Sequence, residues 1–326
     1  MLSALGPVEV VTYRQREDGR SFLADLLREE SLPGGAGAAL WIVSWGFDVP
    51  WLLRQLKGRA CAYHAHSSGY GFSLPAGVPV LAVSRNTLGY WGDRAPRNPL
   101  WLVPNALSPE WLERGQRGGA GERSIDVLVQ LRKNSAYVLK QLVPALQARG
   151  LRVEVQSGWV DDLVDLFNSA KVVLYDSADY WRGRGVTEGF GLPPLEALAC
   201  GCVVFSSFNH ALADSLTPGM TAHQIGQGSL ANDLKRIDAA VHDPAAWGAE
   251  PATLAALLED ASEARWLQRW QVTLSRLDAL REYGALGLHP EESLRSPSTR
   301  RLRLSQSVDR LRGRVANRLP GWLQQR

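Results

Sequence analysis

Cysteine is scarce in this sequence, and long apolar runs are missing. Three of the 326 residues are cysteines: Cys61, Cys200 and Cys202. An odd number without a Cys-x-x-Cys pair argues against a disulfide framework and a zinc site, so we expect reduced thiols in a cytoplasmic protein. We expect Cys200 and Cys202 to be small apolar fillers at a helix end and a strand start. No run of about 18 apolar residues occurs, so we expect no membrane-spanning helix.

A strong excess of one charge is also missing. The formal net charge is +3, which does not indicate a nucleic-acid partner. Residues 1–11 have no basic segment ahead of an apolar core, so we expect no signal peptide there. Positive charge is instead concentrated in residues 290–326, which hold nine arginines against three acidic residues.

Residues 287–326 form a basic tail with an amphipathic pattern between 302 and 323. Its apolar residues recur at spacings of three and four: Leu304, Val308, Leu311, Val315, Leu319 and Trp322. Such a helix can lie on an anionic membrane surface, which predicts a peripheral location at the inner face of the membrane. Packing on the body of the protein and partial disorder stay open as alternatives, because Gly313 weakens the helix.

The rest of the chain alternates short β-rich segments with helical patterns. The length favours two domains. We expect buried strands at 39–45, 59–64, 78–83, 101–103, 125–130, 151–156, 171–175 and 203–206. Strand–helix–strand alternation predicts parallel sheets with right-handed crossovers, so the fold class is α/β with two doubly wound domains. A Gly- and Arg-rich stretch, residues 114–123, reads as the linker between domains 1–113 and 124–286.

Several local features carry further expectations. We expect a first strand at 8–13, a helix that begins at Ser21, and Asp48 as the cap of a helix at 49–56. Helices are also expected at 136–149, 163–168, 229–241 and, as one long element, 253–283. Asp161 and Asp162 read as a helix cap. The segment 180–185 is either a flap that shapes a substrate site or a surface loop.

The most informative stretch is residues 187–201. Gly189 and Gly191 flank Phe190, so the backbone there can approach a ligand closely, and a helix follows from Leu192 until Gly201 stops it. A glycine turn that feeds a helix N-terminus presents N–H groups and a positive dipole end to an anion. Glu188 and Glu196 bracket this turn. The plain alternative is a helix entry that has a stray Glu188 before it and Glu196 in its first turn.

This stretch resembles the signature of retaining glycosyltransferases of family 4, which have the GT-B fold. These enzymes carry two glutamates separated by seven residues around a Gly-Phe-Gly turn, followed by a Pro-x-x-Glu-Ala helix, and Glu188 and Glu196 have that spacing. The resemblance implies two Rossmann-like domains that face each other across a cleft. It also implies that C-terminal helices pack back onto the first domain.

The resemblance implies roles for four candidate catalytic residues. Arg132 and Lys133 follow the first strand of the second domain, where the family neutralises the donor pyrophosphate. In this sequence the two are adjacent, whereas the family usually separates them. Glu188 would hold the hydroxyls of the donor sugar. His66 follows a strand of the first domain and resembles a histidine near the donor sugar, while His64 continues the strand and is the weaker candidate, plausible as a core residue.

The resemblance also implies a binding site for the nucleotide. Glu196 would accept hydrogen bonds from the ribose, and the turn Gly189, Phe190, Gly191 and Leu192 would contact the phosphates. Gly158 and Val160 resemble a loop whose backbone faces the base, and Trp159 between them would either stack on that base or pack. We expect neither a metal nor a further cofactor, because the cations and the helix end would stabilise the leaving group.

The expected function is transfer of a sugar from a nucleotide-diphosphate sugar to a hydroxyl of a glycan or lipid-linked acceptor, in cell-surface polysaccharide or glycolipid synthesis. The alternative is an inactive GT-B protein that binds nucleotide sugars or acts as a scaffold. It is favoured by the segment 14–20, which has a single glycine where family members often have a glycine-rich phosphate loop. An epimerase or phosphorylase of the same fold is a third interpretation.

Overall fold

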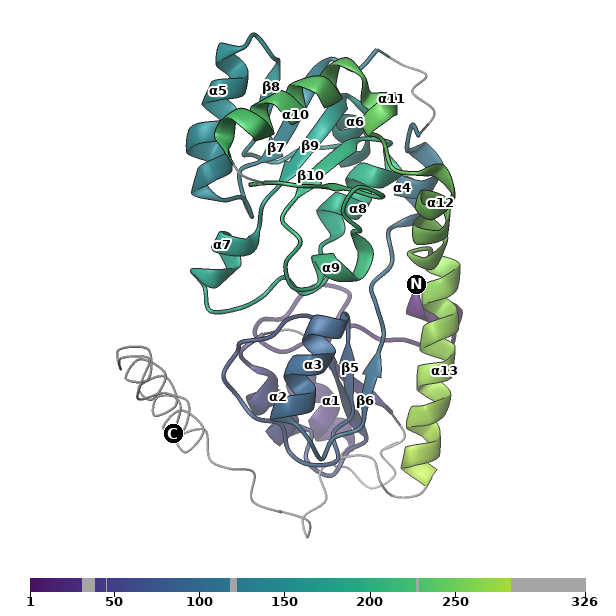
Figure 1. Ribbon diagram of the computed structural model, residues 1–326. Helices are drawn as coiled ribbons and strands as arrows, with labels where there is room; N and C mark the ends of the chain where they lie inside the picture. Colours follow the sequence, from purple (N-terminus) through teal and green to yellow (C-terminus); the bar gives the residue numbers. More distant parts are fainter. Residues whose placement is uncertain (31–38, 45, 118–121, 227–228, 283–326) are drawn as a thin grey trace, which may run out of the picture.

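The computed structural model describes residues 1–30, 39–44, 46–117, 122–226 and 229–282. The chain forms two parallel sheets, one from each half of the sequence, stacked end to end in Figure 1. A long C-terminal helix runs from the second half down the side of the first. The expectation of two α/β units is therefore confirmed.

The N-terminal sheet has the order β3-β4-β5-β6, and all its neighbours are parallel. Its strands are β3 (Trp41–Ser44), β4 (Cys61–Ala65), β5 (Val80–Ala82) and β6 (Leu100–Leu102). A separate parallel pair joins β1 (Val11–Thr12) to β2 (Ser21–Phe22). The other elements before the second sheet are η1 (Leu2–Ala4), α1 (Leu23–Glu30), α2 (Val49–Gln55), α3 (Arg85–Arg94) and α4 (Pro109–Arg114).

The C-terminal sheet has the order β11-β10-β9-β7-β8 and is also parallel. Its strands are β7 (Ile125–Gln130), β8 (Val153–Gln156), β9 (Ala170–Tyr175), β10 (Val203–Ser206) and β11 (His223–Gln224). Its helices are η2 (Val138–Leu142), α5 (Val143–Ala148), α6 (Leu163–Asn168), α7 (Ala178–Arg182), α8 (Leu192–Ala199), α9 (Leu212–Ser215), α10 (Leu230–His242), α11 (Pro244–Trp247), α12 (Pro251–Asp260) and α13 (Glu263–Glu282).

Both faces of each sheet are covered, as the alternation of side chains along a strand requires. In β7, Val127 and Val129 belong to one core cluster and Leu128 to the cluster on the opposite face. In the N-terminal sheet, Ala62 of β4 faces α13 and packs with Trp270. Helix α13 thus supplies one side of the N-terminal core.

Three local expectations were wrong. Ser21 belongs to strand β2, and the helix starts at Leu23. Asp48 occupies the N-cap position of α2 without a capping bond, because its carboxylate accepts from Tyr13 and Arg14. The single helix expected at 253–283 is two helices, α12 and α13, that break between Asp260 and Glu263. The helix expected at 136–149 is present at 136–148, and its middle is the π-helical turn η2.

Other local expectations are confirmed. Asp162 caps α6 by accepting from the N–H of Asp165. Outside these expectations, Ser84 caps α3 by accepting from the N–H of Thr87. All three cysteines are buried free thiols. Cys200 ends α8 and Cys202 precedes β10, where both fill core space as expected.

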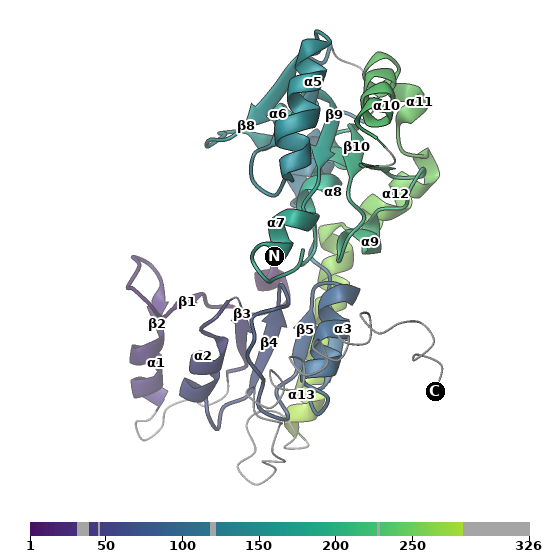
Figure 2. The same cartoon turned by 60° about the vertical axis from the view of Figure 1, so that its left-hand side comes forward.

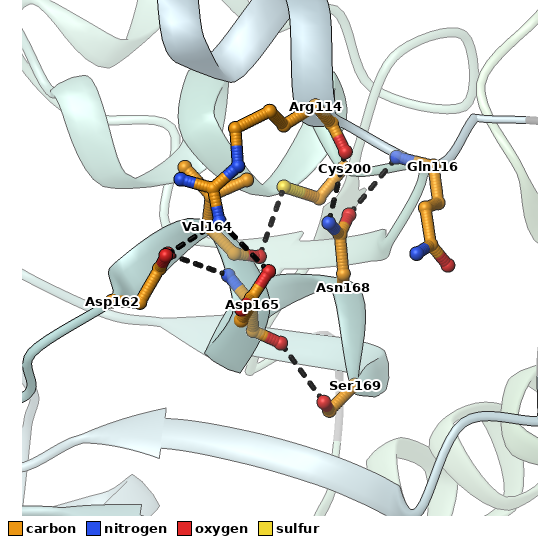
Figure 3. Close-up of polar contacts among 8 residues, drawn as sticks. All are labelled: Arg114, Gln116, Asp162, Val164, Asp165, Asn168, Ser169 and Cys200. Atoms are coloured by element: carbon orange, nitrogen blue, oxygen red, sulfur yellow. Dashed lines mark hydrogen bonds and ion pairs between the residues drawn. The ribbon is translucent and has the colours of Figure 1, made fainter.

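The chain that leaves α4 is bound to the C-terminal half (Figure 3). The Arg114 guanidinium pairs with Asp162 and Asp165 at the start of α6. The Asn168 amide donates to the Arg114 carbonyl at 3.0 Å and accepts from the Gln116 N–H at 2.9 Å. The described part of the stretch 114–123 is therefore held to the C-terminal half by polar contacts. Residues 118–121 and the tail helix expected at 302–323 lie outside the described residues.

Candidate functional site

The strand order of the C-terminal sheet reverses at one point, where open parallel sheets have a crevice. The chain passes from β7 outward to β8 and then back to β9 on the other side of β7, so the connections after β7 and β9 leave in opposite directions. In parallel sheets, ligands bind outside the carboxyl ends of the strands at such a reversal. The loop with Arg132 and Lys133 follows β7 and therefore lines this crevice.

Asn134 fixes the loop after β7. Its amide donates to the Gln130 carbonyl at 2.7 Å, and its oxygen accepts from the Asp176 N–H at 2.8 Å, which ties the ends of β7 and β9 together. The preceding residue, Lys133, has φ +63°, a left-handed conformation that a non-glycine residue seldom adopts. Such strain persists only where the surroundings impose it, and it clusters at functional sites.

Glu188 is the most enclosed acidic group of this crevice, with 3% of its surface exposed. Its Oε2 accepts from the Tyr175 hydroxyl at 2.6 Å and from the Trp181 indole N–H at 2.7 Å. Its Oε1 lies 3.7 Å from the Lys133 Nζ, and that ammonium is 5.3 Å from the centre of the Trp181 ring. Burial, reinforced by the Glu188 charge and hydrogen bond, raises the pKa of Tyr175 well above its usual value, so its hydroxyl remains a donor.

The glycine turn brings the backbone close to two neighbours. Gly191 has φ +89° and is the N-cap of α8, and a Cβ there would lie 2.3 Å from Leu212 Cδ2. A Cβ on Gly189 would lie 1.7 Å from the carbonyl oxygen of His66. Both positions therefore require glycine. Prolines at the second and third helical positions lack N–H groups, so the helix end offers the N–H groups of Gly191 and Leu192 to an anion.

Glu196 is half-buried in the second turn of α8, not in the first as the plain interpretation assumed. Burial raises the pKa of its carboxyl to about 7, Lys133 opposes that rise, and Glu110 adds to it. Lys133 thus acts electrostatically on both glutamates of the motif. The structure gathers a cation and two carboxylates around one glycine turn.

His64 and His66 lie at the end of β4, with ring centres 4.2 Å apart. Burial lowers the pKa of His66 to about 4 and that of His64 to about 3, so both rings are neutral near pH 7. His64 is buried against Trp270 of α13, which fits a core residue. His66 lies at the boundary of the two halves, since its carbonyl is covered by Gly189.

A seam of polar contacts joins the two halves beside this point. Ser67 donates to the Thr187 carbonyl at 2.9 Å, and the hydroxyls of Ser68 and Thr187 are 2.5 Å apart. The Asn86 amide donates to the same Thr187 hydroxyl at 2.8 Å. Further along, Arg85 pairs with Asp214 at 3.1 Å. The residue before Glu188 is therefore anchored directly to the N-terminal half.

The remaining predicted residues follow the ends of β7 and β8, at the same edge of the sheet. Arg132 is exposed next to Lys133, Gly158 is exposed, and Val160 is half-buried after β8. Trp159 is 91% exposed, so it does not pack in the core. Within the described ranges, no hydrogen bond or ion pair joins these residues to Glu188.

Sequence reasoning missed several residues of this site. Tyr175 and Asn134 were not singled out, and Trp181 was left open between a flap and a loop. His210, after β10, is the second described non-glycine residue with a left-handed backbone, at φ +52°, and its ring bonds the Asn209 amide at 2.9 Å. No periodicity marks Tyr175, Asn134 or Trp181, because each acts through a contact with another element. The described residues contain no cluster of three His, Cys, Asp or Glu arranged as metal ligands.

Residues 137–251 match the family Glycosyl transferases group 1. This match contains Glu188, Glu196 and the glycine turn, and it begins just after Lys133. No curated protein matches the chain. None of the described helices is long and apolar enough to cross a membrane.

Solved glycosyltransferase structures share the fold. The chain is similar to a glycosyltransferase from Rickettsia africae, with 9% identity, a TM-score of 0.59, and coverage of 81% of this chain and 84% of that one. For sucrose-phosphate synthase from Thermosynechococcus elongatus the identity is 17%, the TM-score 0.55, and the coverage 74% of each chain. For Anabaena HepE in complex with UDP the identity is 15%, the TM-score 0.50, and the coverage 78% of this chain and 82% of that one. At these identities the likeness establishes the GT-B fold alone, as the sequence predicted.

Proposed function

We propose that this protein is a retaining glycosyltransferase of family 4 that transfers a sugar from a nucleotide-diphosphate sugar to an acceptor hydroxyl. One observation carries the proposal. Lys133 lies at the reversal point of the C-terminal sheet, beside the buried Glu188 carboxylate and within electrostatic reach of Glu196. A cation there suits a pyrophosphate, and two carboxylates suit the hydroxyls of the sugars on either side of it.

The proposed chemistry depends on stabilising the leaving group. As the bond to the anomeric carbon breaks, negative charge builds on the β-phosphate. Arg132, Lys133 and the N–H groups of Gly191 and Leu192 would stabilise that charge, and preorganised donors of this kind contribute strongly to rate. These groups supply the positive charge that a divalent ion would otherwise bring, so the proposed reaction is metal-independent.

The two glutamates have separate proposed roles. Glu196 accepts hydrogen bonds from the ribose hydroxyls, and Glu188 accepts from the donor sugar. We do not assign Glu188 as a nucleophile, because two donors already hold its Oε2. In the proposed mechanism the acceptor attacks on the face of the leaving phosphate. His66 lines the donor-sugar end, and the backbone of Gly158 and Val160 faces the base.

The acceptor and the location follow from the remaining expectations. We propose a glycan or lipid-linked acceptor, in cell-surface polysaccharide or glycolipid synthesis. The N-terminal half would bind this acceptor. The proposed location is cytoplasmic and peripheral at the inner face of the membrane, through the basic stretch 302–323. Vesicle sedimentation with and without anionic lipid tests the last point, and truncation after residue 286 is expected to abolish binding.

A second candidate is an inactive GT-B protein that binds a nucleotide sugar. It is favoured by the loop after β1, whose arginines are engaged by acidic neighbours. Arg14 pairs with Asp48 and Arg16 with Asp25, so neither is poised for a donor phosphate. Binding without turnover is the signature of this candidate.

The test is binding and slow hydrolysis across uridine, guanosine, thymidine and adenosine diphosphate sugars. We expect one donor to bind and to be hydrolysed by the wild type. Glu196→Ala should weaken its binding about tenfold or more, since a charge-assisted bond is lost. The exposed Glu113→Ala serves as the control. Binding without hydrolysis or transfer would favour the inactive candidate, and no binding to any donor would overturn the proposal.

A further inference from the structure

Helix α7 lies between β9 and Glu188, at the end of the C-terminal half that faces the N-terminal half (Figures 1 and 2). It was expected to be a flap or a loop. The structure shows a short helix whose Trp181 side chain reaches back to Glu188 and Lys133. The rest of α7 does not enter the core, since none of its residues is buried. Trp181 is therefore the residue through which α7 meets the site.

The hydrogen bonds at Glu188 are divided unequally between its two oxygens. Oε2 accepts from both the Tyr175 hydroxyl and the Trp181 indole N–H, which occupies the two lone pairs of that oxygen. Oε1 lies 3.7 Å from the Lys133 ammonium, which is an ion-pair distance but too long for a hydrogen bond. No described residue donates a hydrogen bond to Oε1, so its capacity to accept is left for a ligand.

The two donors come from different elements, and that fixes the plane of the carboxylate. With Tyr175 alone, the carboxylate could rotate about its terminal torsion, which is broad for glutamate. The second bond, from α7, holds Oε2 inward and Oε1 toward Lys133. The Trp181 ring also lies within cation–π distance of the same ammonium, at 5.3 Å. One side chain therefore orients both charged groups.

We propose that Trp181 is a positioning residue for the donor sugar: its N–H holds Glu188 so that Oε1 accepts from one sugar hydroxyl, while its ring holds the Lys133 ammonium toward the pyrophosphate. This inference rests on the proposed function. It assigns α7 a role in recognising the sugar part of the donor. It also gives the indole N–H and the ring of Trp181 different roles. The N–H contributes to sugar binding through Glu188, and the ring contributes to phosphate binding through Lys133.

The experiment compares two variants with two ligands. The ligands are the donor selected by the panel above and its nucleoside diphosphate, each titrated calorimetrically. Trp181→Phe keeps a ring and removes the N–H, so it should weaken the nucleotide sugar about tenfold and leave the nucleoside diphosphate unchanged. Trp181→Leu removes both groups and should weaken both ligands. Tyr180→Phe, a hydroxyl removal in the same helix, is the control and should change neither.

Each outcome bears on the inference. Equal losses for both ligands in Trp181→Phe, or no loss for either, would overturn it while the wild type still binds its donor. If the wild type binds no donor, the proposed function fails first, and the two failures are thereby distinguishable. Should Trp181→Phe not fold, Tyr175→Phe removes the other donor to Oε2 and must show the same selective loss of the nucleotide sugar.

Discussion

At the scale of single residues, the ionisation of Glu196 predicts a pH-dependent stability. Burial raises the pKa of its carboxyl from 4.5 in the unfolded chain to about 7 in the fold. Between these values the unfolded state has already lost the proton that the folded state keeps, so this contribution to stability is present below pH 4.5 and is lost as the pH rises through 7. Above pH 7 the fold must hold a partly desolvated carboxylate.

Glu196→Gln should therefore stabilise the protein selectively at high pH. We expect its gain in the free energy of unfolding, relative to wild type, to be larger at pH 8 than at pH 5 by on the order of 2 kcal/mol, after allowance for the half-buried position. Urea denaturation at both pH values measures this difference. Glu113→Gln, at an exposed position, should show no such difference, and a pH-independent effect of Glu196→Gln would contradict the prediction.

Only part of the site could be predicted from the sequence. The spacing of Glu188 and Glu196 around a glycine turn was readable, because both the turn and the helix are local. The partners of Glu188 could not be predicted, since Tyr175 and Trp181 lie on two other elements. The sequence around each of them does not show that its side chain points to Glu188. The left-handed backbone of Lys133 could not be predicted either, because it lies in a loop that Asn134 fixes by joining two strand ends.

At the scale of elements, the contacts between α4 and α6 predict that two variants lose different amounts of stability. Asn168 is 7% exposed and satisfies a backbone carbonyl and a backbone N–H of the segment after α4 (Figure 3). Asn168→Ala would leave both groups unpaired, which should cost about 1–3 kcal/mol. Arg114→Ala removes only solvent-exposed ion pairs and should cost clearly less. Urea denaturation measures the free energy of unfolding of both variants. A larger loss for Arg114→Ala than for Asn168→Ala would contradict the prediction.

Elements were predicted well where one local signal suffices. β7, β10 and α6 have the expected bounds, since each is an apolar segment with a clear start and stop. The helix expected at 253–283 failed because the apolar pattern continues across the break, while the chain turns there to carry α13 onto the N-terminal sheet. Where two successive helices have the same spacing of apolar residues, that spacing does not reveal a change of direction between them.

At the scale of the whole molecule, the two halves are in close backbone contact beside Glu188. Gly189 lies so close to the His66 carbonyl that a Cβ would be 1.7 Å from that oxygen, and Thr187 bonds Ser67, Ser68 and Asn86. The two-unit architecture was predictable from strand–helix alternation. This seam was not, because it joins residues about 120 positions apart and depends on how the halves are oriented.

The seam predicts that one methyl group at Gly189 separates the halves. Gly189→Ala requires the backbone of 66–67 to move away, so the Thr187 contacts should break while each sheet keeps its core. We expect donor turnover to fall more than tenfold, the radius of gyration in solution scattering to increase, and far-UV circular dichroism to remain as in wild type. Gly89→Ala makes the same substitution within α3, where a Cβ meets nothing within 4 Å, and should raise helix stability slightly without changing turnover. Wild-type turnover and size in Gly189→Ala would mean that catalysis does not require the seam, and the close approach of Gly189 to His66 would then have only a packing role.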